Sequence, residues 1–282
     1  MKKLIALALA LLLCGICCAE FDEVEVYTIE FAYSGMTADF DGDYSIETLG
    51  FTVDMDEYGD GSFEVTVNGS SVRIDNCCML DSEIYYMKIG NAYYSYGTLF
   101  MVNEFGPSDD PVTYCILYTD GKLIDAGRIY APVRGLTVSE TGVITTQIRA
   151  DHIGTWSRPA DYILAEGTHY ETDEDGALEW EYRYAICEVP RDIYPMGMVV
   201  ALKTELPLRA SRFDTAASVQ LASGETVILA ASDDVSWLYV TDLNCTVKGW
   251  VRMQSIDYGD YIEINGKYVY VDEVFDDILY AD

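Results

Sequence analysis

The sequence of 282 residues predicts an all-β protein, and three observations support this prediction. Apolar and polar residues alternate with period two in many short runs, as in strands with one buried face. Pairs of residues that tolerate positive φ separate these runs. Apolar residues at helical spacing are nowhere sustained over three turns. Half of the residues are apolar and 23 are tyrosines, so the chain has enough material for a packed core.

The first 19 residues have the pattern of a secretory signal peptide. Lys2 and Lys3 precede an apolar run over 4–13 that is shorter than the roughly 20 residues needed to span a bilayer. We expect cleavage after Ala19, because small residues occur there. A lipoprotein signal is the alternative, although no cysteine follows the usual pair of small residues. The remaining chain has no apolar stretch long enough to cross a membrane, so we expect a secreted protein, extracellular or associated with the cell surface.

The charge balance is strongly acidic. Asp and Glu number 48 against 17 Lys and Arg, and the formal net charge is −31. A field of this sign repels nucleic acid and anionic lipid surfaces, and it favours cations or basic partners. Solubility outside the cell is the simpler explanation of the same composition. We therefore expect no nucleic-acid partner.

The sequence lacks several common signatures of catalytic sites. There is no Gly-x-Ser-x-Gly elbow, no His-Glu-x-x-His and no phosphate-binding glycine loop. The five cysteines after the signal have no zinc-site spacing, and their odd number predicts at most one or two disulfides. Cys77 and Cys78 are adjacent, so they should point to opposite faces of a strand.

The N-terminal region consists of successive strand patterns, predicted at 24–32, 45–54, 62–74, 84–89, 99–102, 113–118 and 122–130. Tight turns are expected at Asp60-Gly61, Asn68-Gly69 and Asp120-Gly121. Residues 168–176 are polar and predict a solvated hairpin tip. Two prolines in 188–195 restrict the backbone to extended conformations. We therefore place a linker at 191–197, between an N-terminal β domain at 20–190 and a C-terminal domain at 198–282.

An acidic loop near the start of the N-terminal domain predicts a metal site. Asp39, Asp41 and Asp43 alternate along it, and Glu47 follows before an apolar strand. Such carboxylates converge their oxygens, and Ca²⁺ takes six to eight oxygens at about 2.3 to 2.6 Å. The loop resembles the calcium loops of VCBS and FG-GAP repeats. The resemblance implies a propeller-like or irregular repeat domain with a structural Ca²⁺ held by these four carboxylates. Tyr44 replaces the usual glycine, and an acidic turn bound only to water is the alternative.

The C-terminal region has a regular order of short strands. Leu206-Pro207-Leu208-Arg209 comes first, followed by Gly224-Glu225 entering Val227-x-Leu229, by Trp237-Leu238-Tyr239-Val240 and by Gly249-Trp250-Val251. This order resembles the bacterial Src-homology-3-like domain, a small β-barrel. The resemblance implies a binding module for cell-wall components or peptides that has no chemistry of its own.

The aromatic positions of this module are the candidate ligand-binding residues Trp237, Tyr239 and Trp250. Trp237 and Tyr239 alternate with Leu238, so they should share a face and flank a groove, whereas Trp250 fits a core position equally well. These observations predict a non-catalytic binding protein for a cell-wall peptide or another extracellular protein. Two alternatives stay open: a glycan-cleaving or accessory extracellular enzyme, whose two carboxylates need no proximity in sequence, and a structural interaction protein whose domains serve as spacers.

Overall fold

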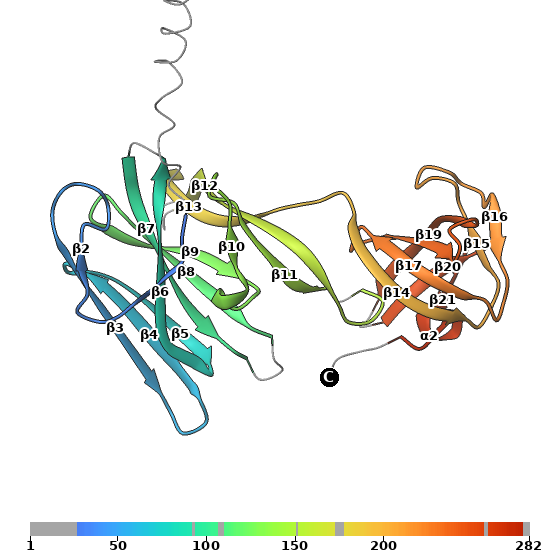
Figure 1. Ribbon diagram of the computed structural model, residues 1–282, viewed down its shortest axis with the longest axis horizontal. Coiled ribbons are helices and arrows are strands. Elements are labelled where there is room, and N and C mark those ends of the chain that lie inside the picture. The colour runs from blue at the N-terminus through green and yellow to red at the C-terminus, as the bar shows by residue number, and fades with distance from the viewer. Residues whose placement is uncertain are drawn as a thin grey trace, which may run out of the picture.

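The computed structural model describes residues 27–91, 94–106, 110–150, 152–172, 178–256 and 259–278, and nearly all of its elements are antiparallel strands (Figure 1). The all-β fold class is therefore confirmed. The predicted signal peptide lies outside these residues, and so do residues 173–176 of the predicted hairpin tip. The only helices in the described ranges are η1 (Val133–Gly135) and α2 (Val271–Val274). Neither has the length and apolar composition needed to span a membrane.

Three stacked sheets form the N-terminal body. The central sheet has the order β1-β6-β7-β8-β9, with β1 Glu30–Ala32, β6 Leu80–Asn91, β7 Tyr94–Glu104, β8 Val112–Thr119 and β9 Lys122–Ile129. One covering sheet consists of β2 Thr37–Ala38, β3 Glu47–Met55, β4 Asp60–Val67 and β5 Ser70–Cys78. The other consists of β10 Thr137–Val138, β11 Ile144–Ala150, β12 Trp156–Thr172 and β13 Leu178–Val189.

The central sheet is buried on both of its faces, as β8 shows most clearly. Every residue of β8 after Val112 is buried. Ile116 belongs to a core that includes Phe63 of β4, whereas its neighbour Leu117 belongs to a second core that includes Ile144 of β11. A strand buried on both faces has a continuous apolar run instead of an alternating pattern. This explains why the sequence of β8 is apolar along most of its length.

Two of the three predicted tight turns are confirmed. The φ values are 46° and 93° at Asn68-Gly69 and 49° and 73° at Asp120-Gly121, as in a type I′ hairpin turn. The prediction for Asp60-Gly61 is wrong, because these residues lie within β4 and Gly59, with φ 88°, precedes them in the turn. A Cβ at position 61 would lie 2.1 Å from the Asp54 carbonyl oxygen. This glycine is therefore explained by close packing of two strands.

The cysteines are free thiols in the described ranges: Cys77, Cys78, Cys115, Cys187 and Cys245. Cys77 is buried in the core between the central sheet and β2–β5. Cys78 is only half-buried, as expected for neighbours that point to opposite faces of a strand.

A curled sheet with the order β21-β20-β19-β18-β17-β14-β22 forms the C-terminal body, drawn in orange and red in Figure 1. Its strands are β14 Tyr194–Leu202, β17 Thr226–Ser232, β18 Trp237–Asp242, β19 Lys248–Ile256, β20 Gly259–Ile264, β21 Lys267–Tyr270 and β22 Phe275–Asp276. A separate hairpin, β15 Leu206–Leu208 and β16 Val219–Leu221, covers one side. The core contains alternate residues of successive strands, such as Leu229, Leu238, Val240 and Val251.

Two segments join the bodies. Residues 190–193 connect β13 to β14, so 194–197 of the predicted linker belong to a strand. The second segment is the β11–β12 turn, whose Ile153 is fully buried in the core of the C-terminal body. The Ile153 N–H donates to Asp260 Oδ2 at 2.5 Å, and His152 Nδ1 lies 2.7 Å from Ser255 Oγ. The N-terminal body therefore contributes a residue to the core of its neighbour.

Candidate functional site

Three aromatic side chains lie on the outward face of the β18–β19 hairpin, here called the aromatic face. Tyr239 pairs with Trp250 across the two strands, and their ring centroids are 4.9 Å apart. Trp237 lies two residues before Tyr239 and shares its face, because Leu238 and Val240 point into the core. All three aromatic residues are half-buried. The structure thus brings together the three ligand-binding residues predicted from the sequence.

Two arginines from the segment after β15 lie over these rings. Arg209 forms a β-bridge with Trp250, with both backbone hydrogen bonds at 2.8 Å. Gly249 permits this approach, since a Cβ there would lie 2.5 Å from the Arg209 carbonyl oxygen. The guanidinium carbon of Arg209 is 5.3 Å from a ring centroid of Trp237, and that of Arg212 is 5.3 Å from Trp250. Both distances are within the range of cation–π attraction, about 6 Å.

Carboxylates hold both arginines on the aromatic face. Arg209 donates to Glu263 at 2.9 Å, and Arg212 donates to Asp192 at 2.5 Å. A second carboxylate, that of Asp233, lies 4.0 Å from Arg212. The hydrogen bond to Asp192 raises the pKa of Arg212 above its usual value. The aromatic face is therefore rimmed by negative charge that favours a cation on the rings.

Sequence reasoning missed these charged partners of the rings. Asp192 lies 20 residues from Arg212, and Glu263 lies 54 residues from Arg209, so no local pattern links them. The available signal was the occurrence of two arginines within four residues in a chain that has only 17 basic residues.

The acidic loop between β2 and β3 gathers three of its four predicted metal ligands. Carboxylate oxygens of Asp39, Asp41 and Asp43 lie within 4.8 Å of one another. Glu47 is not a member of this group. Its carboxylate is buried and accepts the Phe40 N–H at 2.7 Å, so it holds the start of β3 against the loop.

The backbone of the loop takes a left-handed conformation at Tyr44. Tyr44, which replaces the usual glycine, has φ 69° and a side chain that is almost fully exposed. For a non-glycine residue this conformation costs about 1 kcal/mol or more. Asp39 offsets part of this cost, because its carboxylate accepts the N–H groups of Gly42 and Tyr44 at 2.7 and 3.1 Å.

The electrostatics of the loop disfavour further negative charge. Burial raises the pKa of Glu47; the Phe40 N–H opposes this effect, and the three neighbouring aspartates add to it. Asp41 Oδ2 accepts the Gly121 N–H at 2.9 Å, whereas its buried Oδ1 has no hydrogen-bond partner among the described residues. A bound cation would satisfy that oxygen and reduce the repulsion.

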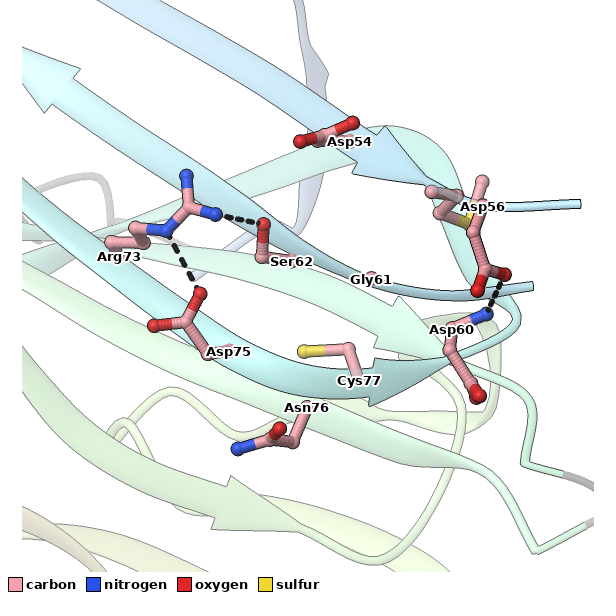
Figure 2. Close-up of a pocket in the computed structure, with 10 residues that line it drawn as sticks. Asp54, Asp56, Asp60, Gly61, Ser62, Arg73, Asp75, Asn76 and Cys77 are labelled. Atoms are coloured by element: carbon pink, nitrogen blue, oxygen red, sulfur yellow. Dashed lines mark hydrogen bonds and ion pairs between the residues drawn. The ribbon is translucent and has the colours of Figure 1, made fainter. Parts of the chain in front are cut away.

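A polar depression of about 590 Å³ lies at the ends of β3, β4 and β5 (Figure 2). Arg73 is on its wall and donates to Asp75 at 2.8 Å and to Ser62 at 2.5 Å. Besides Asp75, the depression is lined by the carboxylates of Asp54, Asp56 and Asp60. Cys77 also lines it, but burial raises the pKa of this thiol and disfavours the reactive thiolate.

A larger cavity of about 1150 Å³ lies at the junction of the two bodies. Arg158 of β12 donates there to Glu188 at 2.5 Å and to Asp234 at 2.9 Å, and its guanidinium lies 4.4 Å from the ring centroid of Tyr194. A glycosidase needs one carboxyl group that gives a proton to the glycosidic oxygen. Two carboxylates bound by one guanidinium are poorly placed for that step. The contacts of Arg158 with Glu188 and Asp234 instead join β12 and β13 to the C-terminal body.

Comparison of this chain with protein-family models, with curated proteins and with solved structures found no match. The resemblances to Src-homology-3-like domains and to VCBS or FG-GAP repeats therefore stay predictions. Among the described residues, the aromatic face is the best-formed candidate site.

Proposed function

We propose that this chain is a secreted, non-catalytic binding protein that holds a cell-wall peptide or another extracellular protein on its aromatic face. The observation that carries the proposal is the presence of Trp237, Tyr239 and Trp250 on one outward surface, with Tyr239 and Trp250 in ring contact. Tryptophan and tyrosine combine a large apolar area with few rotatable bonds, so they bind ligands at low entropic cost. The net charge of −31 favours a peptide over an anionic wall polymer.

Retention on purified peptidoglycan and on its isolated stem peptides tests this proposal. The double variant Trp237→Ala, Tyr239→Ala is expected to lose retention, because it removes two of the three rings. Tyr33→Ala, Tyr58→Ala is the matched control, since it removes two rings of the N-terminal body that are 61% and 79% exposed. Equal retention of wild type and the first double variant would exclude the aromatic face as the binding surface.

We further propose that the acidic loop binds Ca²⁺ weakly and that this ion has a structural role. The proposal is supported by the three carboxylates within 4.8 Å and by the buried Oδ1 of Asp41. Asp39, Asp41 and Asp43 would supply three oxygens, and waters would complete the six to eight that Ca²⁺ takes. With few protein ligands, we expect a dissociation constant on the order of 1 mM, as in the weakest extracellular sites.

Calorimetric titration of the metal-stripped protein with Ca²⁺ tests the second proposal. Asp41→Asn, Asp43→Asn is expected to abolish the heat of binding and the Ca²⁺-dependent rise in melting temperature. Asp56→Asn is the control, because this aspartate also accepts two N–H groups of a turn but lies outside the three-carboxylate group. Absence of heat with wild type would leave the loop as an acidic turn.

A further inference from the structure

The two arginines on the aromatic face are held in different ways. Arg209 is anchored by its β-bridge to Trp250 and by Glu263, and its N–H groups also reach the Asp214 carbonyl oxygen at 3.2 Å. Arg212 lies in the loop 209–218 that joins β15 to β16, and most residues of this loop are exposed. Its hydrogen-bonded partner Asp192 has a side chain that is 78% exposed. Arg209 is therefore fixed to a strand, whereas the Arg212 side chain, which is 22% exposed, reaches the rings from a loop and is held there by side-chain contacts.

The surface beneath Arg212 has the composition of a cation site. The guanidinium lies over the indole of Trp250, beside Tyr239, with the carboxylates of Asp192 and Asp233 at its edge. A π face attracts cations, and carboxylates match the planar N–H donors of a guanidinium. Without Arg212, this part of the aromatic face would present two rings and two carboxylates.

The position of Asp233 is independent of the cation. Its Oδ1 accepts the N–H groups of Ser236 and Trp237 at 2.7 and 2.8 Å, so the turn before β18 fixes it. Its Oδ2 faces Arg212. Because the turn holds Asp233 in place, its negative charge stays beside the rings after Arg212 moves away.

We infer that the ligand of the aromatic face is a basic peptide side chain, an arginine or a lysine, and that Arg212 occupies its position as an internal competitor. This inference rests on the proposed binding function and names its ligand class. A guanidinium or ammonium from a partner would make the cation–π and carboxylate contacts that Arg212 makes. The net charge of −31 would draw such a partner toward the molecule from a distance. An anionic ligand would instead have to separate both arginines from their carboxylates.

Titration of the full chain with the peptide acetyl-Gly-Arg-Gly-Arg-Gly-amide, followed by tryptophan fluorescence, tests the inference. Peptides with citrulline or glutamate in place of arginine keep the length and alter the charge. If Arg212 covers Trp250 about nine-tenths of the time, Arg212→Gln is expected to raise the affinity for the basic peptide about tenfold. Trp250→Ala is expected to abolish binding, with or without Arg212.

Arg73→Gln is the matched control, because it removes an arginine from an exposed ion pair in the N-terminal body. It is expected to leave the affinity unchanged within about twofold, since it lies away from the aromatic face. Thermal unfolding reports whether each variant is folded, and Arg212→Ala provides a second test if the glutamine variant is unstable.

The outcomes distinguish a failure of the basic-ligand inference from a failure of the proposed binding function. Tighter binding of the basic peptide by Arg212→Gln, with no binding of the citrulline or glutamate peptides, would support it. Binding of the glutamate peptide that Arg212→Gln weakens would overturn the inference and leave the binding function intact, because Arg212 would then be a ligand-binding residue. No binding of any of the three peptides by wild type or Arg212→Gln would refute the inference; the binding function would stand if peptidoglycan still retained wild type better than Trp237→Ala, Tyr239→Ala, and would fall with the inference if it did not.

Discussion

Replacement of Ile153 by alanine tests the junction between the two bodies. The Ile153 side chain comes from the β11–β12 turn of the N-terminal body, yet it is fully buried in the C-terminal core. Its φ of 58° is unusual for a β-branched residue, and the hydrogen bond from its N–H to Asp260 keeps the turn in place. The contact therefore stabilises the C-terminal body and couples it to its neighbour.

The expected cost follows from the burial and the backbone conformation. Ile153→Ala removes three buried carbons, at about 0.8 kcal/mol each, and leaves a cavity; such changes usually cost about 2 to 5 kcal/mol. Alanine fits positive φ more easily than isoleucine, which offsets up to about 1 kcal/mol. We expect a net loss of about 2 to 4 kcal/mol. Ile153→Gly should be as stable as the alanine variant or more so, because glycine adopts this φ freely.

Urea unfolding monitored by fluorescence provides the assay, since Trp237 and Trp250 report on the C-terminal body and Trp156 and Trp180 report on the N-terminal body. Ile144→Ala is the matched control: Ile144 is 1% exposed, but it lies in the core between the central sheet and β10–β13. It should destabilise the N-terminal body instead. A loss below about 1 kcal/mol for Ile153→Ala, or a glycine variant clearly less stable than the alanine variant, would refute the insertion of Ile153 in this conformation.

Three further predictions concern single residues. Gly249→Ala is expected to cost about 1 to 3 kcal/mol and to weaken peptide binding, because its Cβ would lie 2.5 Å from the Arg209 carbonyl oxygen; thermal unfolding and peptide titration measure both effects. The pKa of Glu47 is raised in the folded state. Its contribution to the free energy of unfolding is therefore fully present below the usual glutamate pKa, about 4.3, and is lost as pH rises through the folded-state pKa. Glu47→Gln should therefore fall less in stability than wild type between pH 4 and pH 7, and an equal fall in urea unfolding would contradict this. Burial raises the pKa of Asp260, but hydrogen bonds from His152, Ser255 and Ile153 outweigh it and hold that pKa below its usual range. The contribution of Asp260 to the free energy of unfolding is thus fully present above the usual aspartate pKa, about 3.9, and is lost as pH falls through the lower folded-state pKa. Asp260→Asn should therefore reduce the fall in the free energy of unfolding at acid pH.

The sequence predicts most of the strands because their burial is periodic or continuous. The predicted hairpin around Asn68-Gly69 corresponds to β4 and β5, and the predicted strand 113–118 lies within β8 (Val112–Thr119). The error at Asp60-Gly61 arose because glycine serves both turns and close strand packing. The close contact that requires glycine at position 61 is with the carbonyl oxygen of Asp54 on the neighbouring strand, and the local sequence does not reveal this contact.

The candidate site was predictable only in part. Alternation places Trp237 and Tyr239 on one face from the sequence alone, and the strand pairing adds Trp250. The partners of Arg209 and Arg212 depend on how distant strands and the connection to β14 meet in space. The contact of Ile153 with Asp260 spans 107 residues. Contacts at such separations follow from tertiary packing and have no local sequence signature.

The central sheet, with its two apolar faces, determines how the protein can be cut into smaller pieces. A truncation after β9 would expose the face that carries Leu99, Met101 and Leu117, and such an open sheet would associate with other chains. A fragment that folds alone must therefore extend through β13, to Val189. The C-terminal body expressed by itself would lack Ile153 and would have a cavity in its core at the position of that side chain. A stable version would need a larger side chain on a neighbouring core residue to fill this cavity, or a graft of the β11–β12 turn.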